Sequence, residues 1–210
     1  MPLLVDVRKL TVVNDLIDEG AGNVADYFSQ LTGADASVEI KSISFVDPAD
    51  LSAEIGREET FTARIRLTEP PYGIFLMTFP EATAVEIASM MTGREPGGGI
   101  TDQHRGAIQE MCNILTSGFI DGIANTLETT IDMETPTVER QRTDELAGIA
   151  LSHVREDATA VVLDSVIDVA DRDAPLRLQV FLVPDPGAFV NLVDMLDVGA
   201  APNERERVRG

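Results

Sequence analysis

The segment QEMCNILTSGFIDGIANTL, residues 109–127, lies near the middle of the 210-residue chain and has the apolar periodicity of a long helix. The large apolar side chains fall on one helical face: Ile108, Met111, Cys112, Leu115, Phe119 and Ile123. Polar side chains fall on the opposite side: Glu110, Asn113, Ser117 and Asp121. Because Glu110 and Asn113 are three residues apart, their side chains can reach the same object. The spacing alone favours an ordinary solvated face over a functional one.

The same order of elements occurs on both sides of a polar, glycine-rich connector at 94–103. Before it, we predict a helix at 7–31, strands at 36–46, 61–67 and 72–79, and a short helix at 80–93. After it, we predict a helix at 102–128, strands near 130–139, 146–154, 159–169 and 176–184, and a short helix at 186–199. Each half therefore has a long helix, about three strands and a short helix.

The two halves also match as text. FLMTFPEATAVEIASMMTG (75–93) aligns with FLVPDPGAFVNLVDMLDVG (181–199) at an offset of 106, with Phe75 on Phe181. We predict an α/β (α+β) fold with pseudo-two-fold symmetry. It forms a single domain over residues 1–200, with repeats at about 7–93 and 102–199, followed by a flexible tail at 201–210.

The composition restricts the compartment and the partners. Asp and Glu number 36 against 16 Lys and Arg, giving a net charge of −20, and only Lys9 and Lys41 are lysines. Such a surface repels phosphate backbones, so nucleic acid is not an expected partner. The composition favours a halophile, where molar salt shortens the Debye length to about 3 Å; an ordinary acidic protein is the alternative. No apolar segment is long enough to span a membrane, and the sequence shows no signal-peptide pattern. Because Cys112 is also the only cysteine and cannot form an internal disulfide, we expect a cytoplasmic protein without membrane contact.

The text around Glu110 and Asn113 resembles the second long helix of the CheC family of chemotaxis phosphatases, which includes CheX and FliY. The family motif is Asp or Ser, three residues, Glu, two residues, Asn, twenty-two residues and Pro. Glu110, Asn113 and Pro136 fit this spacing, whereas Gly106 occupies the Asp or Ser position. The supporting side chain is therefore missing or replaced by a neighbour such as Asp102. The resemblance covers most of the chain and implies a CheC-like fold, in which two long helices pack with an antiparallel-rich sheet.

The first half resembles the family less closely. GAGNVADYFSQLTG (20–33) is similar to the glycine-rich stretch that follows the family's first Glu and Asn, but those two positions are Asp15 and Asp18 here. The partner proline falls at Lys41. Because an ionised aspartate has no N–H to donate, we expect this second site to be degenerate.

The resemblance implies that the protein removes the phosphoryl group from the aspartyl phosphate of a CheY-type response regulator. The partner supplies Mg²⁺ and a lysine, so no cofactor or metal of the chain's own is expected. Asn113 would orient the water, because a carboxamide both accepts and donates hydrogen bonds, and Glu110 would pair with the lysine. The alternative is a non-enzymatic adaptor that binds CheY, the receptor deamidase CheD or the motility motor.

Other candidate sites in the sequence have structural explanations. Gly20, Ala21 and Gly22 lie inside a helical pattern, so close helix packing is expected there, not a phosphate loop. His104 has no Cys or His partner at a metal-binding spacing. Cys112 falls in the apolar stripe and is predicted to be a buried structural thiol.

Overall fold

The computed structural model describes residues 7–47, 50, 59–70, 72–94, 96–126, 129–142, 160–170, 172 and 175–185. Its elements in chain order are α1 (Val7–Thr32), β1 (Ala36–Val46), β2 (Glu59–Leu67), β3 (Gly73–Phe79), α3 (Glu81–Thr92), α4 (Asp102–Thr126), β4 (Thr137–Arg142), β5 (Ala160–Val169) and β6 (Leu176–Pro184). No helix within these ranges is long and apolar enough to cross a lipid bilayer.

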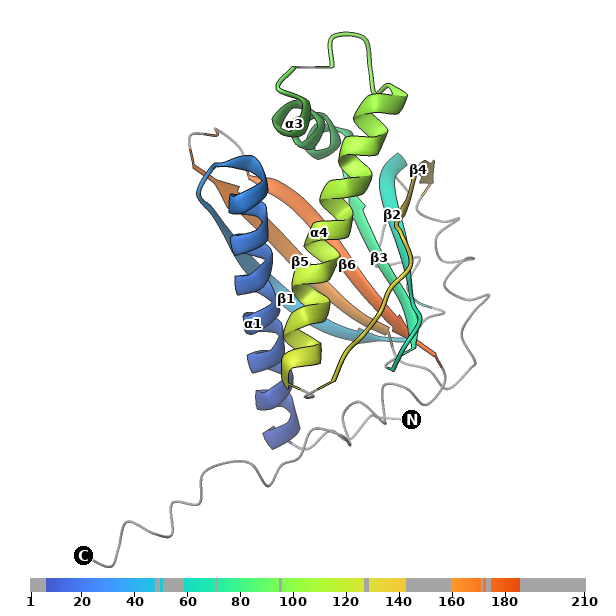
Figure 1. The fold of residues 1–210 in the computed structure, drawn as a ribbon. Coiled ribbons are helices and arrows are strands. Elements are labelled where there is room, and N and C mark those ends of the chain that lie inside the picture. Colours follow the sequence, from blue (N-terminus) through green and yellow to red (C-terminus); the bar gives the residue numbers. More distant parts are fainter. Residues whose placement is uncertain are drawn as a thin grey trace, which may run out of the picture.

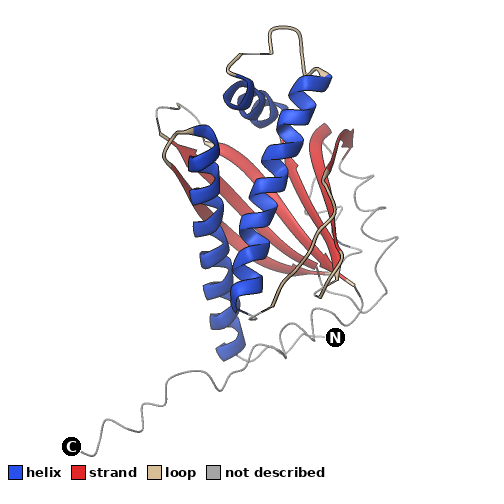
Figure 2. Ribbon diagram, in the orientation of Figure 1, coloured by secondary structure: helices blue, strands red, loops and turns tan. Residues whose placement is uncertain are grey.

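The strands form one sheet in the order β1-β5-β6-β3-β2-β4, and every neighbouring pair is antiparallel. Figure 1 shows α1 and α4 lying side by side across one face of this sheet, with α3 beside the beginning of α4 at one end. Colouring by secondary structure makes the two layers plain, helices in front of strands (Figure 2). The predicted α+β architecture, two long helices packed with an antiparallel sheet, is confirmed.

Alternation along the strands divides the side chains between two faces. On β3, Phe75 and Met77 belong to the large core cluster that also holds Phe119 of α4. Ile74 and Leu76 point the other way and belong to a separate cluster that includes Phe181. The helix-covered face therefore carries the main core, and the opposite face carries its own smaller apolar group.

The strand order is symmetric between the halves. Exchanging β1 with β4, β2 with β5 and β3 with β6 gives the same order read from the opposite edge of the sheet. The offset of 106, however, does not preserve the faces of the sheet. It places Phe75, in the helix-side core, on Phe181, which belongs to the cluster on the other face. A symmetry that keeps both helices on one side needs an odd offset in these two strands, because a one-residue shift moves every side chain to the other face.

Most predicted boundaries agree with the structure to within two residues. The short helix begins after Pro80 and ends at Gly93, whose φ of 68° lies in the left-handed region that glycine tolerates, and whose N–H donates to the carbonyl of Ser89. β4 is the exception, because it begins at Thr137 and not near 130. Pro136 precedes it and has no N–H for a ladder, and before it only Met133 forms an isolated bridge, to Leu67. The predicted elements at 146–154 and 186–199 and the tail lie outside the described residues.

Candidate functional site

The site is built on α4, whose start is fixed by a reciprocal cap. The Thr101 hydroxyl accepts from the His104 backbone N–H at 3.5 Å, and His104 Nδ1 accepts from the Thr101 backbone N–H at 3.2 Å. This is the geometry of a capping box with histidine in place of glutamate. Asp102 adds a negative charge in the first turn, where the helix dipole favours it. His104 therefore has a structural role, because it caps the N-terminal end of α4.

One stripe of α4 is anchored in the core. Ile108, Met111, Cys112 and Leu115 are at most 1% exposed, as the periodicity predicted. Burial raises the pKa of the Cys112 thiol to about 12, so the predicted inert, structural cysteine is supported. Anchoring along this stripe sets the rotation of the helix and hence the direction of the residues opposite it.

A second flank of α4 packs directly on α1, and glycines make the approach possible. A Cβ on Gly122 would lie 2.7 Å from the Cα of Gly20, and a Cβ on Gly118 would lie 2.8 Å from the backbone N of Val24. Neither distance leaves room for a side chain. Helix packing therefore explains Gly20, as predicted. The prediction is wrong for Gly22, which is exposed and where a Cβ would meet no atom within 4 Å.

Polar contacts fix the same two helices against sliding. Tyr27 of α1 donates its hydroxyl to Asp121 Oδ2 at 2.8 Å, and this hydrogen bond to a carboxylate is the main reason that the pKa of Tyr27 is raised. The amide of Asn23 donates to the carbonyl of Gly118 at 3.5 Å. Asp121, expected on the solvent side of α4, thus belongs to the helix interface, because α1 occupies that flank.

Glu110 and Asn113 remain on the outward side. Glu110 is exposed and Asn113 is half-buried, one residue beyond the fully buried Cys112. The Ser117 hydroxyl donates to the backbone carbonyl of Asn113 at 2.9 Å, so Ser117 is turned back onto the helix one turn later. The exposed carboxylate of Glu110 thus lies one turn from the half-buried amide side chain of Asn113.

Gly106 leaves a gap on this outward side, one turn before Glu110. It is exposed, and a Cβ built on it would meet no atom within 4 Å. Asp102, one turn earlier, is also exposed. No close packing therefore requires glycine at position 106.

Pro136, the third motif residue, is buried in the segment that connects α4 to β4. This segment is tied to β2 by two backbone hydrogen bonds, from Thr68 N to the carbonyl of Asp132 and from Glu134 N to the carbonyl of Arg66, each 2.9 Å.

The corresponding motif positions of the first half are all exposed. Asp15 and Asp18 are exposed on α1, and Lys41 is exposed on β1, where it pairs with Glu39.

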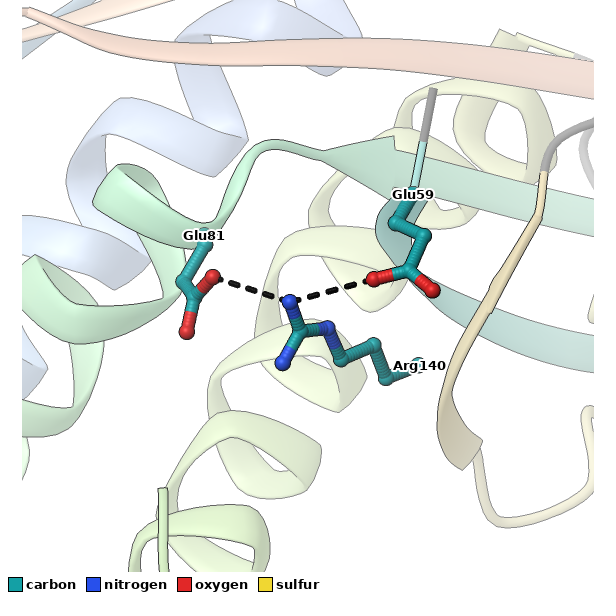
Figure 3. Close-up of polar contacts among 3 residues, drawn as sticks. All are labelled: Glu59, Glu81 and Arg140. Carbon is teal, nitrogen blue, oxygen red and sulfur yellow. Dashed lines mark hydrogen bonds and ion pairs between the residues drawn. The ribbon is translucent and has the colours of Figure 1, made fainter. Parts of the chain in front are cut away.

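The short helix α3, which packs on α4, is fastened to the sheet by arginine. Arg140 of β4 lies 3.1 Å from Glu81 in the first turn of α3 and 3.2 Å from Glu59 of β2 (Figure 3). A second pair joins Glu86 to Arg172. All these side chains are about one-third to two-thirds exposed, so each pair contributes at most about 1 kcal/mol. They orient α3 more than they stabilise it.

The described residues contain no group of three or more His, Cys, Asp or Glu side chains placed to hold a metal ion. A cavity of about 920 Å³ is lined by Thr78, Asp164, Arg177 and Gln179 among others, and none of its described lining residues comes from α1 or α4. Neither Glu110 nor Asn113 is among the described residues that line this cavity, so the pair is not placed to enclose a small molecule there.

Three contacts around the site were not foreseen from the sequence: the Thr101–His104 cap, the Tyr27–Asp121 bond and the Arg140 bridge. The cap had a readable signal, because threonine three residues before a hydrogen-bonding side chain, at a helix start, is the capping-box pattern. The other two join residues far apart in the chain and leave no local pattern.

The sequence matches known chemotaxis proteins. The family profile described as "Chemotaxis phosphatase CheX" matches residues 61–166. A protein of Halobacterium salinarum with the name "Putative CheY-P phosphatase CheC1" is 37% identical over 198 residues, which cover 93% of this chain and 100% of that protein. The source of that relative is a halophilic archaeon, in line with the acidic composition.

Solved structures agree on the fold. Thermotoga maritima FliY superposes with a TM-score of 0.76 at 13% identity, covering 93% of this chain and 98% of that one. A CheX protein of Desulfovibrio desulfuricans superposes with a TM-score of 0.53 at 11% identity, covering 80% and 98% respectively. Together with the sequence matches, these likenesses show that the chain belongs to the CheC/CheX/FliY family of chemotaxis phosphatases.

Proposed function

We propose that this protein hydrolyses the aspartyl phosphate of a CheY-type response regulator and that Asn113 orients the attacking water. The observation that carries the proposal is the outward side of α4, where the exposed Glu110 and the half-buried Asn113 lie one turn apart on a helix anchored along its other faces. An acyl phosphate is already reactive, so the phosphatase has to supply little beyond a well-placed nucleophile. Positioning of this kind accounts for about 10²-fold or more in rate.

The two side chains suit different parts of the task. The Asn113 amide can accept one hydrogen bond from a water and donate another, which fixes the water's direction, as a glutamine does in GTPases. The Glu110 carboxylate, standing in solvent, can pair with the lysine beside the regulator's phosphoryl group and so set the register of the two proteins. Glu110→Ala should therefore mainly raise the half-saturating concentration of the regulator, whereas loss of Asn113 should lower the maximal rate.

The divalent cation of this reaction belongs to the partner in this proposal. The regulator would hold the Mg²⁺, which would supply positive charge to the phosphoryl oxygens, and no ligand from the phosphatase is expected. On α1, the exposed Asp18 at the asparagine position has no hydrogen-bond donor when ionised, and the exposed Asp15 is one methylene shorter than glutamate, so we assign the activity to α4 alone.

The alternative is an adaptor that binds a CheY-type regulator, CheD or the motility motor without hydrolysis, and Gly106 is the residue that favours it, because the family's Asp or Ser is absent there. One preparation distinguishes the two functions. Phosphoryl lifetime and complex formation are measured with the same phosphorylated regulator in high salt. A lifetime shortened in proportion to added protein supports the phosphatase; binding with an unchanged lifetime supports the adaptor.

A further inference from the structure

Two arginines stand side by side on the sheet face that α1 and α4 leave uncovered. Arg64 and Arg66 alternate on β2 with the buried Ile65 and Leu67, so both side chains point away from the helices, and both are exposed. They are roughly 7 Å apart along the strand. In a chain with 36 acidic residues, no ion pair to either arginine is found within the described residues.

A small cavity of about 140 Å³ lies beside this pair. It is lined by Arg64, Arg66, Ile74, Glu134, Thr135 and Thr137. Two of these residues carry hydroxyl donors, and they flank the buried Pro136 in the segment before β4. The bond from Glu134 N to the carbonyl of Arg66 holds this segment against β2, so the cavity wall is part of the sheet and not a free loop.

We propose that this cavity, formed by Arg64, Arg66, Thr135 and Thr137 and here named the β2 anion site, binds a small oxyanion of phosphate size. Guanidinium groups present several N–H donors in a planar fork that matches phosphate and carboxylate oxygens. The volume is well below the roughly 300–1,000 Å³ of sites for drug-sized ligands, so the ligand is a single oxyanion group. The site lies on the opposite sheet face from Glu110 and Asn113 and is independent of the proposed phosphatase activity.

Among the described residues that line the site, Glu134 carries the one carboxylate, and it gives the proposal a directional test. It is exposed and makes no ion pair with either arginine within 4 Å among the described contacts. A bound anion would meet repulsion from this charge. Removing the charge should therefore strengthen binding, the opposite of what removing either arginine should do.

The test is an NMR titration of the full-length protein with inorganic phosphate at constant ionic strength, with acetate in a parallel arm. Saturable shifts at Arg64, Arg66 and Thr137 are expected. Arg64→Gln and Arg66→Gln should each raise the dissociation constant about tenfold or more, because each removes charge-assisted hydrogen bonds. Glu134→Gln should lower it. Arg94→Gln, at an exposed arginine elsewhere, should leave it unchanged.

Arg64→Lys separates a recognition fork from bulk charge, since lysine keeps the charge and loses the planar donors. An intermediate loss of affinity supports the site, and acetate binding at the same residues would show that a carboxylate also fits. The proposal is overturned if phosphate causes no saturable shift, if the Arg64 and Arg66 variants bind as tightly as the wild type, or if Glu134→Gln weakens binding.

Discussion

A single methyl group at position 122 should push α1 and α4 apart. The Cβ of an alanine there would lie 2.7 Å from both the Cα and the N of Gly20. Ordinary contacts of this kind begin near 3.4 Å, and the atoms met belong to backbone and not to a side chain that could rotate away. The helices must therefore separate by several tenths of an ångström along a buried interface.

The cost follows from that geometry. Overpacking a well-filled interior costs about 1–3 kcal/mol, while replacing a helical glycine by alanine returns up to about 1 kcal/mol. We expect Gly122→Ala to be destabilising on balance. Gly22→Ala is the matched control on α1, because a Cβ there meets nothing within 4 Å. It should be stabilising by about 0.5–1 kcal/mol.

Thermal unfolding of both variants in molar KCl measures the difference. For a protein of this size, 1 kcal/mol corresponds to roughly 2–4 °C, so Gly122→Ala should lower the melting temperature by several degrees and Gly22→Ala should raise it slightly. Equal effects of the two substitutions would refute the close helix contact. So would a Gly122→Ala protein as stable as the wild type.

Three further predictions concern charge and reactivity. Raising the KCl concentration should raise the melting temperature, because screening relieves the repulsion within a net charge of −20 and disrupts only half-exposed pairs such as Glu81–Arg140; a flat or falling curve contradicts this. Since burial raises the pKa of Cys112 from 9.0 to about 12, the thiol stabilises the fold fully below pH 9 and loses that contribution as the pH rises toward 12. A thiol reagent at pH 8 should therefore label Cys112 only after unfolding, and rapid labelling of the native protein would disprove its burial. Asp18→Asn should leave phosphatase activity unchanged, whereas a gain in activity would show that the first-half site is competent.

Local patterns predicted the elements whose ends are set by local chemistry. The helix at 81–92 was predicted from Pro80 and Gly93, and both residues terminate it in the structure. The apolar stripe of α4 was predicted because its burial depends only on helical periodicity. The late start of β4 could have been inferred as well, since Pro136 cannot donate to a ladder.

Features that depend on how the halves meet could not be predicted from the sequence. The match of Phe75 with Phe181 is strong as text, yet the two side chains lie on opposite faces of the sheet, and only the pairing register reveals this. Asp121 was assigned to solvent because periodicity does not show which flank α1 would cover. For the candidate site, spacing placed Glu110 and Asn113 on one outward side, but their proposed role came from the family motif.

The central claim is that Asn113 orients the water, and the rate of phosphate loss from a phosphorylated CheY-type regulator tests it most directly. The matched control is Asn125→Ala, the same substitution at an exposed amide three turns further along α4, with thermal unfolding to confirm that both variants are folded. The account predicts that Asn125→Ala keeps the wild-type rate and that Asn113→Ala loses about 10²-fold or more of the stimulated rate. An Asn113→Ala protein that is folded and still shortens the phosphoryl lifetime like the wild type would contradict it.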